Sequence, residues 1–331
     1  MPRNVDNFKR RIDYLRISIT DWCNLRCIYC RPRGKWKKLP HDEILSYEEI
    51  IQICHIAVRL GITKIRITGG EPLLRRNIIY LCENLSRIDK LESLTITTNG
   101  VLLKHFASKL YRAGVQRLNV SLDTLNPRKY YEITGKNMFH KVWSGIEEAL
   151  LVGFYPVKIN VVAMRGINDN EIGELAKLTF KYPVHVRFIE LMPFLDNPEE
   201  PESRFISTDE ILNILRDVGT ISPVSSSNVN GPATHFRFKG ALGKVGLISP
   251  ISHHFCPSCN RLRLTADGKL RACLFSNTET DIKTALRSGA SEEELEAIFH
   301  EAILAKPEKH SLNQVCRSSV SSHRPMVAIG G

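Results

Sequence analysis

The sequence lacks the features that would place a protein in or across a membrane. No stretch of its 331 residues is long and apolar enough to span a bilayer, and residues 1–20 contain no apolar signal segment. We therefore expect a cytoplasmic protein with no membrane partner. Because thiols stay reduced in the cytoplasm, clusters among the nine cysteines are expected to be metal ligands and not disulfide partners.

Acidic residues are also in short supply. The chain has 35 Asp and Glu against 46 Lys and Arg, which gives a formal charge of +11. Much of the surplus lies in residues 1–38. Such a segment attracts nucleic acid or a polyphosphate ligand, and it is equally consistent with a solvated basic surface. The length and the 43% hydrophobic content are enough for one large domain with an appendage.

No internal repeat is present beyond a strand-then-helix rhythm between residues 12 and 220. The clearest helix begins at Ser46, with Glu49 completing a capping box, and ends at Gly61. Alternating strands and helices imply a parallel sheet, either open or closed into a barrel. The expected strands, which alternate apolar and polar residues, are residues 14–20, 64–70, 93–99, 117–123, 157–163 and 185–191.

One face of these strands is polar, and the other is mostly Leu, Ile and Val. A parallel strand covered by helices should be apolar on both faces. We interpret the polar face as the interior of an incomplete (β/α)6 TIM-like barrel that holds a charged ligand. The alternative is an antiparallel sheet with one wet face, which the intervening helices disfavour. The polar face comprises Arg16, Ser18, Lys64, Arg66, Thr68, Thr95, Thr97, Asn119, Ser121, Asp123, Lys158, Asn160, His185 and Arg187.

The pattern changes in the last third of the chain. Residues 222–232 are expected to be a loop, Asp267-Gly268 a hairpin turn, and residues 291–305 an acidic helix. The expected units are residues 1–220, the partial barrel, and residues 221–331, a region that closes the barrel, carries a second metal site and ends in a Gly-Gly tail.

Three cysteines follow the first expected strand. Cys23, Cys27 and Cys30 have the spacing C-x3-C-x2-C, and the carboxyl ends of the strands form the catalytic face of a parallel barrel. Thiolates suit an iron–sulfur cluster, which ordinarily takes four protein ligands. Three ligands would leave one iron with an open position, where a cofactor or substrate could bind.

A second set of three cysteines has the spacing C-x2-C-x13-C. A structural zinc site is one interpretation, with a fourth ligand from His253, His254 or Cys316. The set comprises Cys256, Cys259 and Cys273.

Two arginines favour a ligand-binding metal site over a structural one. Arg261 and Arg263 alternate on one expected strand beside the second cysteine set, so both point the same way. Two guanidinium groups aimed at a metal site indicate an anionic ligand there. A surface strand with exposed arginines is the plainer alternative.

The first cysteine motif, with Tyr29 before its third cysteine, resembles the signature of the radical S-adenosylmethionine (SAM) superfamily. The segment "GGEP", residues 69–72, is similar to the segment of that superfamily that receives the methionine end of SAM. Glycine there permits close approach of the backbone to a ligand. The resemblance implies that the open iron binds SAM and that one electron from the cluster yields a 5′-deoxyadenosyl radical.

The chain combines both cysteine motifs with the segment "NRLRLTADGKLR" and the terminal "IGG". This combination resembles the GTP 3′,8-cyclase family of molybdenum cofactor biosynthesis over nearly the whole chain. The resemblance implies two [4Fe-4S] clusters, SAM as cofactor and GTP as substrate. The radical would remove the ribose 3′ hydrogen, and the ribose carbon would bond to guanine C8. The product would be (8S)-3′,8-cyclo-7,8-dihydroguanosine 5′-triphosphate, made in the first step of the pathway. In that family the diglycine tail reaches toward the active site and is needed for turnover.

The resemblance also implies roles for the matching residues. The cluster ligands are the two sets of three cysteines. No Walker motif occurs, so the triphosphate must be held by side-chain cations. The SAM contacts are Tyr29, Gly70, Ser121 and Met192. The GTP contacts are Arg16, Arg66, Thr97, Lys158, Arg261 and Arg263, with Arg187 as an addition, and Arg66, Arg261 and Arg263 are expected to be catalytic.

Other cysteines and two departures from the family pattern need a separate interpretation. Cys54 and Cys82 are expected to be buried structural thiols. Trp22 and Arg31 flank the first cysteine motif and differ from the usual family residues, which puts the packing of that loop in doubt.

The expected partners are an electron donor and, through the product, the cyclic pyranopterin monophosphate synthase. Nucleic acid is not expected, and the chain is expected to be a monomer or a homodimer. Two rival functions remain at this point. One is a peptide-modifying radical enzyme with auxiliary clusters, and the other is a basic zinc-binding module for nucleic acid.

Overall fold

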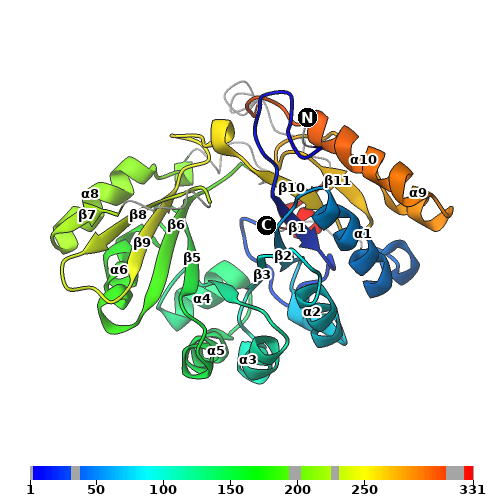
Figure 1. The fold of residues 1–331 in the computed structure, drawn as a ribbon. Helices are drawn as coiled ribbons and strands as arrows, with labels where there is room; N and C mark the ends of the chain where they lie inside the picture. Colours follow the sequence, from blue (N-terminus) through cyan, green and yellow to red (C-terminus); the bar gives the residue numbers. More distant parts are fainter. Residues whose placement is uncertain (1–2, 31–37, 194–202, 225–230, 311–323, 331) are drawn as a thin grey trace.

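The computed structural model describes residues 3–30, 38–193, 203–224, 231–310 and 324–330. A single sheet runs through it, with the strand order β12-β11-β10-β1-β2-β3-β4-β5-β6-β9-β8-β7. The sheet curves into an arc, with helices along its outer side and the C-terminus inside (Figure 1). No helix in these described ranges has the length and apolar character needed to cross a membrane.

The middle of the sheet is parallel and follows the order of the chain. Each of β1 to β5 pairs in parallel with the next strand, and all six strands begin within one residue of the positions that the alternation predicts. The strands are β1 (Tyr14–Ser18), β2 (Lys64–Thr68), β3 (Ser93–Thr98), β4 (Arg117–Ser121), β5 (Val157–Ala163) and β6 (Val184–Glu190).

The helices that connect these strands begin and end at recognisable signals. The predicted capping box is confirmed, because the Ser46 hydroxyl accepts from the Glu49 amide and the Glu49 carboxylate accepts from the Ser46 amide. Helix α4 was not predicted, although Asn126 caps it and Pro127 occupies its first turn. The helices are α1 (Tyr47–Arg59), α2 (Ile78–Ser86), α3 (Leu103–Arg112), α4 (Pro127–Thr134), α5 (Phe139–Val152), α6 (Ile172–Lys181) and α8 (Thr208–Val218).

The outer face of the sheet packs on these helices and forms the core. Leu15 and Ile17 of β1 and Ile65 and Ile67 of β2 are completely buried. Because side chains alternate across a strand, the residues between them point to the inner side of the arc. The apolar face therefore fixes which side chains line the interior.

The C-terminal region extends both sides of the parallel sheet. Strand β9 pairs in parallel with β6, and β10 pairs in parallel with β1. Antiparallel strands complete the two ends. The elements are β7 (Ile221–Pro223), β8 (Ala233–Phe238), β9 (Lys244–Ile248), β10 (Arg261–Leu264), β11 (Lys269–Arg271), β12 (Thr280–Asp281), α9 (Lys283–Arg287), α10 (Glu292–Leu304) and α12 (Met326–Ile329).

Two local predictions in this region have different outcomes. The turn at Asp267-Gly268 is confirmed, since it joins the antiparallel strands β10 and β11 and Gly268 has a φ of +77°. The loop predicted for residues 222–232 is wrong at its start, because Ser222 and Pro223 pair with β8. Residues 225–230 of that segment lie outside the described ranges.

We expect Leu15→Ala in β1 to lower the free energy of unfolding by about 2–5 kcal/mol, because it leaves a cavity at the centre of the core. Leu151→Ala is the matched control, since Leu151 is 83% exposed, and it should change the stability by less than about 0.5 kcal/mol. Urea unfolding followed by circular dichroism measures both. Equal midpoints for the two variants would contradict the assigned core.

Candidate active site

All the site residues predicted from the sequence lie in the wall of one cavity of about 460 Å³ inside the arc. The first cysteine set follows the end of β1. In the second set, Cys256 and Cys259 precede the start of β10, and Cys273 follows β11. The residues are Cys23, Cys27, Cys30, Cys256, Cys259, Cys273, Tyr29, Gly70, Ser121, Met192, Arg16, Arg66, Thr97, Lys158, Arg187, Arg261 and Arg263.

The loop of the first cysteine set is held by the "GGEP" segment at the end of β2. The Gly70 amide donates to the Thr20 carbonyl at 2.6 Å, and the Glu71 amide donates to the Trp22 carbonyl at 2.7 Å. A Cβ atom on Gly70 would lie 2.3 Å from the Trp22 oxygen. The glycine expected to make room for a ligand therefore makes room for the cysteine loop, and it also lines the cavity.

The Glu71 carboxylate joins this segment to β3. It accepts hydrogen bonds from the Asn99 amide at 2.6 Å and from the Thr98 hydroxyl at 2.7 Å. Burial raises the pKa of Glu71 to about 7. The Asn99 side chain in turn donates to Cys23 Sγ at 3.6 Å and to Asn24 at 2.7 Å. The ends of β2 and β3 thus orient the cysteine loop through a chain of hydrogen bonds.

Tyr29 is fixed by Asp123 from the end of β4. Its hydroxyl donates to the Asp123 carboxylate at 2.7 Å, and the Val162 amide donates to the other oxygen at 2.8 Å. Burial raises the pKa of Asp123 to about 6 and, together with Asp123, that of Tyr29 well above its usual value. Asp123 was predicted on the inner face but not as a support for Tyr29.

The three thiols of the first set fit a cluster of soft ligands. Burial and the neighbouring Cys30, Asp123 and Cys23 all raise the pKa of the Cys27 thiol well above its usual value. Three thiolates could share this pocket only if a cationic centre offset their repulsion. Within the described ranges, no three His, Cys, Asp or Glu side chains converge on a single metal ion. A cluster requires no such point, because each cysteine binds a different iron.

The second cysteine set lies at the opposite end of the same strands. Cys256 and Cys259 come directly before β10, which runs parallel to β1, and Cys273 follows the antiparallel β11. Of the ligands that a zinc site would borrow, His253 pairs with the Asp209 carboxylate at 2.7 Å, and Cys316 lies outside the described residues.

Two buried cations that the sequence analysis missed support the second set. Lys306 Nζ donates to the carbonyls of Arg261 at 2.8 Å and Ala272 at 2.6 Å. Burial would raise the pKa of the Cys259 thiol, but Lys306 and Arg261 lower it overall. Arg10 donates to the Cys256 carbonyl at 2.9 Å. No local pattern distinguishes Lys306 or Arg10 from the many solvated cations of the chain.

Cations line the cavity between the two cysteine sets. Burial, together with other cations of the wall, lowers the pKa of Lys158 to about 7 and that of Arg187 to about 9. Within the described structure, Arg187 Nε and the Thr97 hydroxyl are buried without a hydrogen-bond partner. Gly246 makes room for Arg187, since a Cβ atom there would lie 2.9 Å from Arg187 Cγ. Buried positive charge and unsatisfied polar atoms together fit a polyanionic ligand.

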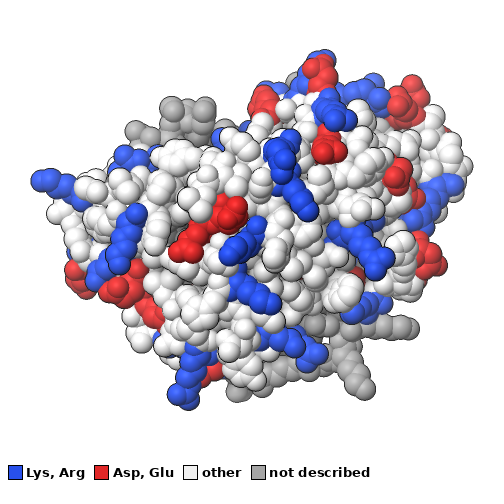
Figure 2. Space-filling view, turned by 90° about the horizontal axis from the view of Figure 1, so that it is seen from below, with Lys and Arg blue, Asp and Glu red and all other residues white. Residues whose placement is uncertain are grey.

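Basic residues line this cavity and also occur on the outer face seen in Figure 2. There, Lys and Arg are scattered and interspersed with Asp and Glu. Of the predicted departures near the first motif, Trp22 is 51% exposed, and Arg31 lies outside the described ranges. Cys54 and Cys82 are completely buried, as predicted.

The C-terminal tail also reaches the cavity. Met326 of α12 lines it, and the Gly330 carbonyl accepts a hydrogen bond from Arg263. Gly330 has a φ of +72°, and a Cβ atom on it would lie 2.7 Å from Thr68 and 3.2 Å from Ser18. The tail therefore ends beside the carboxyl ends of β1 and β2, and Gly331 lies outside the described residues.

A mostly parallel sheet with a three-cysteine loop after its first strand defines a radical SAM enzyme. The Radical SAM superfamily model matches residues 17–179, and the Molybdenum Cofactor Synthesis C model matches residues 184–312. The structure resembles SuiB of Streptococcus suis bound to S-adenosylmethionine, with a TM-score of 0.60 and 16% identity over 96% of this chain and 77% of that one. That likeness shows the fold alone.

The particular family follows from curated relatives. The chain is 52% identical to the GTP 3′,8-cyclase of Thermodesulfovibrio yellowstonii over 98% of this chain and 99% of the relative. It is 47% identical to the GTP 3′,8-cyclase of Desulforamulus reducens over 99% and 100% of the two chains. The chain belongs to the GTP 3′,8-cyclase family, radical SAM enzymes of molybdenum cofactor biosynthesis whose cofactors are SAM and [4Fe-4S] clusters.

We expect Gly70→Ala to lower the free energy of unfolding by about 1–3 kcal/mol, because the added methyl group must displace the Trp22 backbone. Gly173→Ala in α6 is the matched control, where the one described atom outside the helix within 4 Å of the new Cβ is a Val218 methyl at 3.2 Å. Gly173→Ala should leave the free energy of unfolding almost unchanged. Urea unfolding measures stability, and iron analysis after anaerobic reconstitution measures cluster loading. A Gly70→Ala protein that matches the control in both would contradict the packing role.

Proposed function

We propose that this chain converts GTP to (8S)-3′,8-cyclo-7,8-dihydroguanosine 5′-triphosphate, the first step of molybdenum cofactor biosynthesis. The observation that carries the proposal is the pair of three-cysteine sets at opposite ends of one cation-lined cavity. A cavity with a cofactor-binding end and a substrate-binding end suits a reaction between two bound molecules. The match with curated cyclases over nearly the full chain supports the same reaction.

We assign the carboxyl ends of the parallel strands to SAM. Cys23, Cys27 and Cys30 would hold one [4Fe-4S] cluster, and the cluster with SAM supplies the one-electron chemistry that begins the reaction. The hydrogen bond from Tyr29 to Asp123 keeps the tyrosine ring beside the cysteine loop. The proposed SAM contacts are Tyr29, Gly70, Ser121 and Met192.

We assign the opposite end to GTP. Cys256, Cys259 and Cys273 would hold a second [4Fe-4S] cluster, which would supply an iron with an open position for the guanine base. The triphosphate needs several side-chain cations, because no Walker loop supplies backbone amides. The proposed GTP contacts are Arg16, Arg66, Thr97, Lys158, Arg187, Arg261 and Arg263, of which Arg66, Arg261 and Arg263 would be catalytic.

The architecture suits a cavity that binds SAM at one end and GTP at the other. We propose that β1 to β6 and their helices form an incomplete (β/α)6 barrel within residues 1–220, and that residues 221–331 close it. Parallel pairing of β10 with β1 and of β9 with β6 supports such closure. An electron donor would reduce the first cluster, and the cyclic pyranopterin monophosphate synthase would consume the product.

The assay for this function is anaerobic reconstitution followed by incubation with GTP, SAM and a reductant, with products read by mass spectrometry. We expect the parent to form 5′-deoxyadenosine and the cyclised nucleotide. Cys23→Ser should form neither. Arg261→Ala should still form 5′-deoxyadenosine but lose cyclisation by roughly 10²-fold or more. Arg128→Ala is the control, because the Arg128 side chain is 89% exposed. Loss of 5′-deoxyadenosine in Arg261→Ala would contradict the division of roles.

GTP binding should weaken as the pH rises above 7. Lys158 has its pKa lowered to about 7 in the free protein, so it is largely neutral at pH 8 to 9. A bound triphosphate favours the charged ammonium and raises this pKa, so binding takes up a proton. We expect Kd for GTP to increase by up to roughly tenfold per pH unit above 7. Titration calorimetry in buffers of different ionisation enthalpy measures the proton uptake, which Lys158→Met should abolish. A Kd that is constant from pH 7 to 9 would exclude this role.

A further inference from the structure

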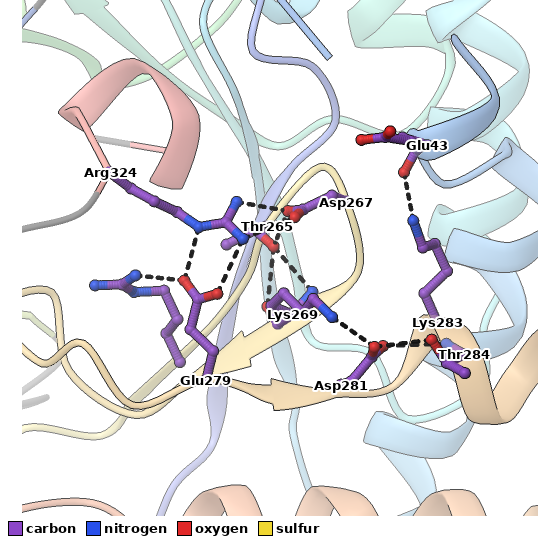
Figure 3. A network of polar contacts seen from close by, with 10 residues as sticks. Glu43, Thr265, Asp267, Lys269, Glu279, Asp281, Lys283, Thr284 and Arg324 are labelled. Carbon is purple, nitrogen blue, oxygen red and sulfur yellow. Dashed lines mark hydrogen bonds and ion pairs between the residues drawn. The ribbon is translucent and has the colours of Figure 1, made fainter. Parts of the chain in front are cut away.

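The last described segment of the chain is tied to the β10–β11 hairpin by one arginine. Arg324 donates to both oxygens of Asp267, at 2.9 and 2.8 Å. The same guanidinium contacts both oxygens of Glu279, each at 2.9 Å. Figure 3 shows Arg324 between the two carboxylates, just before the short helix α12. Two bidentate contacts from one side chain fix its position far better than a single surface ion pair.

The partners of Arg324 are themselves held in place. Arg271 is 2% exposed, and its guanidinium pairs with Glu279 at 2.5 Å. The Thr265 hydroxyl donates to Asp267 at 2.6 Å. Burial opposes the charge on Asp267, but Arg324 and Thr265 lower the pKa of its carboxyl overall. The cluster of charges is therefore rigid on the hairpin side, and Arg324 is its connection to the tail.

The segment beyond Arg324 depends on this connection. Helix α12 is four residues long, too short to be stable alone. Its residues are buried, Met326 lines the cavity, and Gly330 accepts a hydrogen bond from Arg263. If the tail left the cavity, Arg263 would lose that contact and the wall beside Ser18 and Thr68 would open.

We propose that Arg324, clasped by Asp267 and Glu279, is a positioning residue that holds the C-terminal tail in the cavity and thereby holds Arg263 in its catalytic orientation. The inference deepens the proposed function, because it assigns the tail anchor of the same site. Arg324 is not among the residues that line the cavity wall.

The first test needs no cofactor or substrate. The purified full chain is treated with carboxypeptidase, and release of the C-terminal residues is timed by mass spectrometry. Arg324→Ala should release them at least tenfold faster than the parent, and Asp267→Asn, which weakens one half of the clasp, should lie between. Arg165→Ala is the matched control, because Arg165 pairs with Glu210 at 2.6 Å on the surface, and it should match the parent. Equal release from Arg324→Ala and the parent would overturn the proposal.

The second test measures turnover of GTP by the reconstituted variants. We expect kcat of Arg324→Ala to fall at least tenfold, with partial recovery in Arg324→Lys, which keeps the charge but can satisfy only one carboxylate well. The midpoint of thermal unfolding of Arg324→Ala should stay within a few degrees of that of the parent. If Arg324→Ala does not fold, tail release and kcat of Asp267→Asn are compared with those of the parent instead. Faster tail release with unchanged kcat would overturn the positioning role. The carboxypeptidase test does not depend on the cyclase reaction. If the parent protein has no cyclase activity, the proposed function is overturned, but the carboxypeptidase test of the tail anchor remains valid.

Discussion

The parallel pairing of β10 with β1 is the interaction on which the active site depends. It places Tyr14 opposite Arg261 and Arg16 opposite Arg263, although these partners are almost 250 residues apart in the sequence. Because β1 ends at the first cysteine loop and β10 begins at the second, one strand pair sets both ends of the cavity. The same register brings Arg263, Arg16 and Arg66 into a row across three neighbouring strands. A shift by one residue would turn every side chain of β10 to the other face.

Placing several cations on the inner face of these strands costs free energy. Apolar packing on the outer face and hydrogen bonds on the inner face offset that cost. Desolvation and neighbouring cations lower the pKa of Arg16, Arg187 and Lys158, so a bound anion would stabilise their charged forms. Apolar packing on the outer face of the same strands supplies the stability that the inner face does not. The cations in the cavity wall therefore favour a polyanionic ligand. Hydrogen bonds such as that from Arg187 to Asn119 keep the cations oriented meanwhile.

The supports of the two cysteine sets differ in character. The first set is held by the ends of neighbouring parallel strands, through Gly70, Glu71 and Asp123. The second is held by distant segments, with Arg10 from the N-terminus and Lys306 after α10. The tail adds a third contribution, because Gly330 contacts Arg263 from inside the arc. Arg10 and Lys306 thus meet at the end of the cavity that we assign to GTP, whereas the tail reaches the carboxyl ends of β1 and β2.

The sequence by itself determined the parallel βα order, the polar inner face and both cysteine sets. These follow from period-two alternation and from short spacings, which are local properties of the chain. It also indicated the family, through motifs such as the second cysteine set with Arg261 and Arg263 between its members. Only the tertiary structure decided that β10 docks beside β1, that Gly70 makes room for Trp22, and that Lys306 and Arg324 are anchors. The physical reason is that each of these contacts joins segments distant in sequence, so no local pattern separates an anchoring cation from a solvated one.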